Sequence, residues 1–107
     1  KEFDKMSTEA YLMTTEFKDD GRIVKTIEAE STFNFYFDEA LAQEICEIGG
    51  VWLAERIDMV EIEVEEAEDI VNNFDFSKVD PETEKKFKKT VEDYKKAGED
   101  YIAWYCY

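Results

Sequence analysis

The sequence lacks histidine altogether and contains only two cysteines, one proline and four glycines among its 107 residues. Without histidine, the Ser-His-Asp and Cys-His arrangements of nucleophilic catalysis are excluded, and the usual ligand set of zinc is missing. The glycines do not form a phosphate-binding loop, and the sequence has no EF-hand calcium motif. Pairs of acidic residues are abundant, so no single pair can be distinguished as the general acid and general base of a catalytic site. We therefore expect no catalytic residues, no metal site and no cofactor, and we predict that the protein is not an enzyme.

Long hydrophobic runs are also missing. The most apolar stretches, residues 35–37 and 101–107, are too short or too polar to span a bilayer, and the first residues do not match a signal peptide. Cys46 and Cys106 lie far apart without C-x-x-C spacing. This spacing favours two free thiols in a reducing compartment, although a disulfide stays open. We predict a cytoplasmic protein.

The sequence is rich in acidic and apolar side chains. It contains 28 acidic and 13 basic residues, for a formal net charge of −15, and 44% of its residues are hydrophobic. The hydrophobic content argues against disorder, and the length suffices for one domain with its own core. We predict that residues 1–107 form a single acidic globular domain.

The sign of the charge limits the partners. Phosphate groups of nucleic acids and anionic lipids attract proteins through lysine and arginine, which are in the minority here. We therefore expect neither direct nucleic-acid binding nor membrane binding, and we expect a basic protein as the partner.

The negative charge is concentrated in the middle of the chain. Residues 28–75 contain fifteen acidic side chains and one basic side chain, Arg56, whereas residues 1–27 and 76–107 are nearly neutral. Such an asymmetry indicates an interaction surface rather than a general solubility device.

The N-terminal part shows the alternation of a β-hairpin. Residues 11–18 and 22–37 alternate between apolar and polar side chains, and Asp19-Asp20-Gly21 between them is a turn signal. The predicted buried face consists of the odd-numbered apolar residues Tyr11, Met13, Phe17, Ile23, Ile27, Ala29, Phe33, Phe35 and Phe37. Because two strands alone are marginally stable, we expect a helix to cover this face.

A first helix is predicted directly after the hairpin. Asp38 is a candidate N-cap, because its carboxylate can accept the free N–H groups of the first turn. Leu41, Ala42, Ile45 and Ile48 follow at helical spacing, and Gly49-Gly50 predicts the end of this helix.

Residues 51–74 fit two interpretations. A heptad seam of Leu53, Ile57, Val60, Val64, Ala67, Val71 and Phe74 favours one continuous helix. The alternation and β-branched residues at positions 60–65 instead favour a third strand followed by a short helix.

Asp80-Pro81 is typical of a helix start, and apolar residues recur from Phe87 to Tyr105 at the same spacing. With residues 75–80 as a short connection, this helix is predicted to fold back on the preceding one. The predicted fold class is thus α+β. An N-terminal β-hairpin, with a third strand in the alternative interpretation, packs against helices, and the chain ends in an antiparallel helical hairpin.

The candidate partner-binding residues are the acidic residues of the central segment: Glu55, Asp58, Glu61, Glu63, Glu65, Glu66, Glu68 and Asp69. On a continuous helix they extend over roughly 21 Å. This gives about one charge per 2.6 Å, which approaches the 1.7 Å of duplex DNA. If residues 60–65 form a strand, Glu61, Glu63 and Glu65 line one exposed face instead. The alternative explanation is a solvated surface paired with the lysines of residues 85–96.

Three functional hypotheses follow from this surface. The leading one is a small acidic inhibitor that binds the basic groove of a nucleic-acid-binding enzyme, a nuclease or effector complex, by mimicking nucleic-acid charge. Phage anti-CRISPR and anti-restriction proteins are of this type. The second is an immunity protein or antitoxin that neutralises a basic nuclease toxin. The third is a structural adaptor or dimerisation module, and a homodimer stays open. The aromatic residues Trp104, Tyr105 and Tyr107 either complete the core or anchor a partner.

Overall fold

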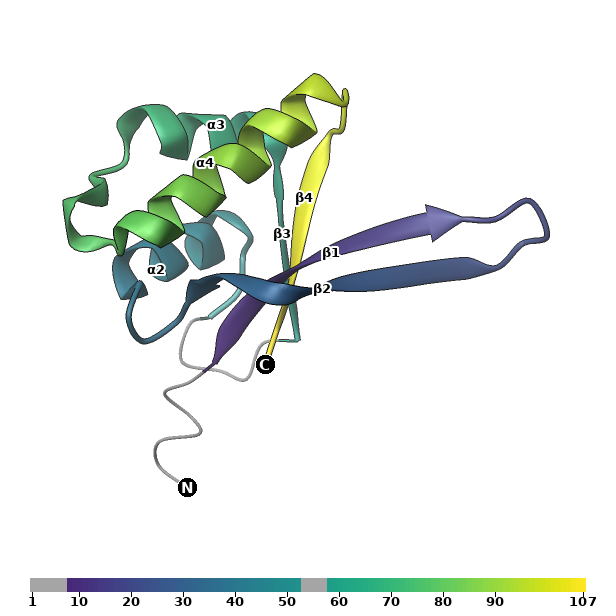
Figure 1. The fold of residues 1–107 in the computed structure, drawn as a ribbon, viewed down its shortest axis with the longest axis horizontal. Helices are drawn as coiled ribbons and strands as arrows, with labels where there is room; N and C mark the ends of the chain where they lie inside the picture. The colour runs from purple at the N-terminus through teal and green to yellow at the C-terminus, as the bar shows by residue number, and fades with distance from the viewer. Residues whose placement is uncertain (1–7, 53–57) are drawn as a thin grey trace.

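The computed structural model describes residues 8–52 and 58–107, which form a four-stranded antiparallel sheet covered on one face by helices (Figure 1). The strands are β1 (Glu9–Phe17), β2 (Ile23–Asn34), β3 (Met59–Glu63) and β4 (Tyr101–Cys106), in the spatial order β2–β1–β4–β3. The helices are α2 (Glu39–Ile48), α3 (Val64–Asn73), the short 3₁₀ helix η1 (Phe76–Lys78) and α4 (Pro81–Lys96). The predicted α+β class is confirmed. Among the residues that the structure describes, none of the helices combines the length and the hydrophobicity that a membrane-spanning helix requires.

The N-terminal hairpin is confirmed, but its predicted buried face is only partly correct. Phe33 is in the core and Phe35 packs against it, whereas four other members of that face are exposed: Phe17, Ile23, Ile27 and Phe37. Ala10 pairs with Phe33 and both are buried in the core, whereas Tyr11 pairs with Ser31 on the opposite face. The register shifts on both sides of Tyr11, and each shift adds residues to β2. Because the side-chain period of a strand is two, an extra residue moves the following side chains of β2 to the other face.

The outer half of the hairpin extends beyond the helices as a two-stranded arm (Figure 1). Phe17 and Ile23 pair with each other in this arm and are 75% and 60% exposed. The arm therefore contributes little to the core, although its alternation predicted a buried face.

The continuous helix predicted for residues 51–74 is wrong, and the alternative interpretation agrees with the structure. The seam residues Leu53 and Ile57 lie outside the described residues. In β3, Val60 and Ile62 are buried, whereas the alternate residues Met59, Glu61 and Glu63 are exposed. Pairing of the whole strand with β4 explains why alternation prevails over the heptad spacing here.

The C-terminal helical hairpin is also wrong. Helix α4 begins as predicted, because Asp80 Oδ1 accepts the N–H of Glu82 at 2.9 Å and Pro81 occupies the first helical position. It ends before Gly98, which adopts a positive φ of 74°. The chain then returns as β4, which lies between β1 and β3.

The core is organised around a tryptophan of β4. Trp104 is fully buried, and its ring stacks on Phe87 of α4 at 6.0 Å and meets Phe33 of β2 edge-on at 5.5 Å. Ile102 and Cys106 point to the same side and are buried as well. One face of β4 therefore packs against both the hairpin and the helices.

Asp38 has a different role from the predicted one. It occupies the N-cap position of α2, but its side chain makes no capping bond to that helix. Instead, its buried carboxylate accepts three hydrogen bonds, from Asn34 N at 2.9 Å, Asp80 N at 3.2 Å and Thr83 Oγ1 at 2.9 Å. These bonds connect the end of β2 to the first turn of α4, and they offset the cost of burying a charge.

Replacing Asp38 with alanine should destabilise the fold by about 3 kcal/mol, because three donors, among them the buried hydroxyl of Thr83, lose their acceptor. Urea denaturation followed by circular dichroism measures this loss. Asp75→Ala is the matched control, since Asp75 is exposed and accepts one bond, from Ser77 N. A loss for Asp38→Ala no larger than that for Asp75→Ala would contradict the role assigned to Asp38.

The two cysteines are free and buried. Burial raises the pKa of Cys46 to about 11, and burial together with the neighbouring Cys46 and Asp58 raises the pKa of Cys106 to about 12. At pH 8, a disulfide-exchange reagent should therefore label neither thiol in the native protein and both thiols in urea. Because the unfolded thiols ionise first, the free energy of unfolding should also decrease as the pH rises above about 9. Rapid labelling of the native protein would contradict this burial.

Candidate interaction surface

The predicted acidic residues lie on two consecutive elements rather than on one rod. Asp58 precedes β3, Glu61 and Glu63 belong to β3, and the other described members of the set belong to α3: Glu65, Glu66, Glu68 and Asp69. Glu55 lies outside the described residues. Helix α3 turns away from the direction of β3 (Figure 1), so the carboxylates follow a bent path.

On β3, the acidic residues alternate with the core. Glu61 and Glu63 are exposed on the face away from the helices, while Val60 and Ile62 are buried on the opposite face. Alternate residues of a strand are about 6.6 Å apart. The expectation for a strand is thus confirmed for Glu61 and Glu63, whereas Glu65 lies in the first turn of α3.

Two of the acidic residues start helix α3. Glu63 is its N-cap and forms a capping box with Glu66, whose Oε1 accepts the N–H of Glu63 at 2.9 Å. Carboxylates are also favourable near the positive end of a helix. Glu63 and Glu66 therefore have a role in the fold that does not need a partner.

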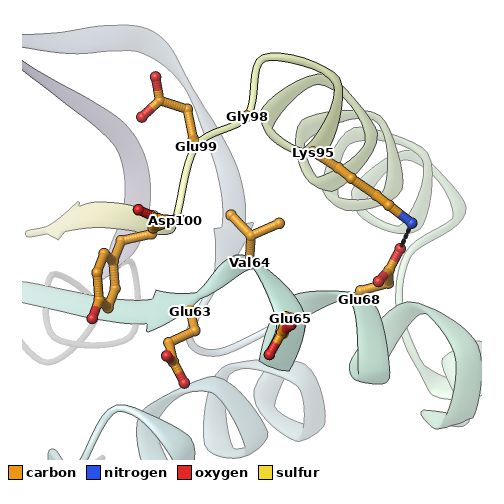
Figure 2. A pocket seen from close by; sticks show the side chains of 9 residues that line it. Glu63, Val64, Glu65, Glu68, Lys95, Gly98, Glu99 and Asp100 are labelled. Carbon is orange, nitrogen blue, oxygen red and sulfur yellow. Dashed lines mark hydrogen bonds and ion pairs between the residues drawn. The ribbon is translucent and has the colours of Figure 1, made fainter.

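A shallow hollow of about 540 Å³ lies between the start of α3 and the turn that follows α4 (Figure 2). Its acidic lining consists of Glu63, Glu65, Glu68, Glu99 and Asp100, and its one basic lining residue is Lys95, which forms an ion pair with Glu68. In Figure 2, the side chains of Glu63 and Glu65 extend to the same side, and that of Glu99 extends away from them.

The sequence reasoning missed Glu99 and Asp100, which belong to the neutral C-terminal segment. They reach the hollow because β4 returns antiparallel beside β3 and pairs Tyr101 with Glu63. The carbonyl of Asp100 also accepts the N–H of Val64 at 2.9 Å. Gly98 is the local signal of this turn, because it adopts a positive φ, a conformation that favours glycine. Three of the four glycines, Gly98 among them, have positive φ.

The lysines of α4 leave most of this acidic set unpaired. Lys88, Lys89 and Lys96 form ion pairs with acidic residues of α4 itself, at 2.6–3.1 Å. Lys86 lies 3.9 Å from Glu30 of β2. Within residues 8–52 and 58–107, Lys95 alone pairs with a member of the predicted acidic set. The alternative of a surface neutralised by these lysines therefore holds only for Glu68.

The aromatic residues at the C-terminus divide between the two faces of the sheet. Trp104 is in the core, as described above, whereas Tyr105 is partly exposed and Tyr107 is 61% exposed. The ring of Tyr107 lies 5.3 Å from that of Tyr105. Aromatic side chains and the exposed carboxylates of β3 thus share the face that the helices leave uncovered.

No protein-family model matches this sequence, and no curated protein or solved structure matches it either.

Proposed function

We propose that this protein is a small acidic inhibitor that binds the basic groove of a nucleic-acid-binding enzyme and presents nucleic-acid-like charge to it. The observation that carries this proposal is the unpaired state of the carboxylates at the β3–α3 corner. Glu61, Glu65 and Asp69 are exposed, and none of them forms an ion pair with any residue that the structure describes.

This arrangement has a cost that a partner offsets. Like charges held close together destabilise the compact state through repulsion. A basic groove removes this repulsion when it binds, and it also attracts the acidic surface over a distance of about one Debye length. Binding is therefore expected to be fast and to weaken as salt is added.

The bent path of the carboxylates restricts the groove that fits. The charges continue from an extended strand into the first two turns of a helix, with Glu99 and Asp100 beside them. The proposal therefore needs a partner groove that accommodates a corner, rather than a straight channel along a duplex.

A triple variant, here called the corner variant, tests the proposal without changing residues that the fold uses. Glu61→Gln, Glu65→Gln and Asp69→Asn together remove three negative charges but keep the capping box and the Glu68–Lys95 pair. The matched control removes three charges from α2 and α4 through Glu39→Gln, Glu47→Gln and Glu82→Gln, all exposed. Each immobilised protein is used to capture basic nucleic-acid-binding enzymes from a lysate at low and high salt. A captured enzyme is then purified and assayed for binding to a DNA duplex in competition with each variant.

The parent and the control should displace the duplex at low salt, and the corner variant should need at least tenfold more protein, since three charge contacts are lost. The corner variant should be as stable as the parent or more stable. Equal competition by the corner variant and the control would contradict the proposal, because it would make the effect one of bulk charge.

Removing the basic residue of the hollow should have the opposite effect. Lys95→Gln frees Glu68 and makes the corner more negative, so the captured enzyme should bind more tightly and with a steeper salt dependence. Lys96→Gln is the control, because Lys96 pairs with Glu92 within α4. The same competition assay compares the two variants. If both change the affinity equally, the corner is not the binding surface.

A further inference from the structure

The face of the sheet that the helices leave uncovered carries a cluster of tyrosines. Tyr107 stacks on Tyr11 of β1 at 4.7 Å and contacts the ring of Tyr105 at 5.3 Å. The backbone of Tyr107 is held beside β1, because its N–H and carbonyl pair with Glu9 at 3.1 and 2.9 Å. Tyr101 of β4 lies on the same face as Tyr105 and is 53% exposed. These residues form an ordered aromatic surface on the last strand and its neighbour.

Among the strand residues that the structure describes, this face carries negative charge and almost no positive charge. Strands β1, β3 and β4 contain no lysine or arginine, and β2 contains only Lys25, which lies in the projecting arm opposite Thr15. Glu61 and Glu63 of β3 are exposed here, and Glu9 of β1 accepts a hydrogen bond from the hydroxyl of Tyr11 at 3.3 Å. Burial, with the carboxylate of Glu9 as a further cause, raises the pKa of Tyr11.

Ala103 has the shortest side chain on the uncovered side of β4. Ala103 separates Tyr101 from Tyr105 along β4, and it lies opposite Glu61 on β3 and Met13 on β1. Glu63 lies opposite Tyr101. Directly opposed side chains of antiparallel strands are about 5 Å apart at Cβ, and diagonal neighbours are within reach of long side chains. A planar group over Ala103 would thus lie between two tyrosine rings and next to a carboxylate.

We infer that this surface, the tyrosine face formed by Tyr11, Tyr101, Ala103, Tyr105, Tyr107 and Glu61, binds an arginine-rich segment of the partner. The inference rests on the proposed function and names the chemistry that the partner presents. A guanidinium group is planar, stacks on aromatic rings and donates in a fork to a carboxylate. The ammonium group of lysine has the same charge, but it is not planar and cannot stack in the same way.

Other occupants fit this face less well. A second copy packed face to face would place the carboxylates of β3 near carboxylates, with no lysine or arginine from β1, β3 or β4 to balance them. The phosphates of a nucleic acid would be repelled by the same carboxylates. A cationic segment is complementary to both the charge and the rings.

Fluorescence anisotropy with two labelled probes tests the inference on the full chain. The probes are a peptide of nine arginines and a peptide of nine lysines, which carry the same charge. Two variants change the face without changing its charge: Tyr101→Thr, which keeps a good strand former, and Ala103→Leu, which fills the space between the rings. The control is Tyr36→Thr, because Tyr36 is 52% exposed but lies at the corner between β2 and α2. Urea denaturation of each variant verifies that it is folded.

The parent should bind the arginine peptide several-fold more tightly than the lysine peptide. Tyr101→Thr and Ala103→Leu should each weaken binding of the arginine peptide by about fivefold and change binding of the lysine peptide by less than twofold. The control Tyr36→Thr should bind the arginine peptide like the parent. Equal loss for both peptides, or no loss in either variant, overturns the inference. A dimer of the parent that either variant dissociates, measured by sedimentation, also overturns it, because the face would then belong to a second copy.

This experiment separates the inference from the proposed function. If the tyrosine-face variants bind the arginine peptide like the parent while the corner variant loses affinity for the captured enzyme, the inference fails and the proposed function stands. If the corner variant and its charge-matched control compete equally, the proposed function fails, whatever the peptides show.

Discussion

The N-terminal hairpin and β3 have no direct pairing with each other, and they share a sheet only because the last residues of the chain lie between them as β4. Both faces of the molecule depend on that strand. Its inward side chains, Trp104 foremost, join the hairpin to α4, while its outward tyrosines form the uncovered face. The turn before β4 brings Glu99 and Asp100 beside α3. The core, the tyrosine face and the acidic corner, which consists of Glu61, Glu65 and Asp69, are therefore consequences of the long-range pairing of β4 with β1 and β3.

Local signals in the sequence predicted the elements that depend on local chemistry. The Asp19-Asp20-Gly21 turn, the Gly49-Gly50 pair and Asp80-Pro81 correctly indicated the hairpin, the end of α2 and the start of α4. The heptad spacing failed where strand pairing prevailed, at Val60 and at Tyr101, because a helical repeat and a strand both place apolar residues at some of the same positions. The register shifts of β2 left no local signal, so the buried face of the hairpin was predicted correctly at Phe33 but not in the outer arm.

The composition alone revealed the acidic segment, but it did not predict which acidic residues have structural roles and which are free to bind a partner. Asp38 is buried and connects β2 to α4, Glu63 and Glu66 start α3, and Glu68 pairs with Lys95. The structural roles of these residues account for part of the negative charge without a binding partner. On β3 and α3, the carboxylates left over are Glu61, Glu65 and Asp69, and they form a much smaller surface than the 48-residue segment suggested. That surface borders the tyrosine face where Glu63 lies opposite Tyr101.

We propose that the acidic corner and the tyrosine face together form one binding surface for a cationic partner. This proposal can be tested by titrating the ¹⁵N-labelled full chain with the nine-arginine peptide and following the amide chemical shifts. We expect the largest shift changes in β3, the first turn of α3, the turn after Gly98 and β4, with small changes in α2 and in the outer face of α4. Changes concentrated in α2 and α4, or spread evenly over all exposed acidic residues, would contradict it.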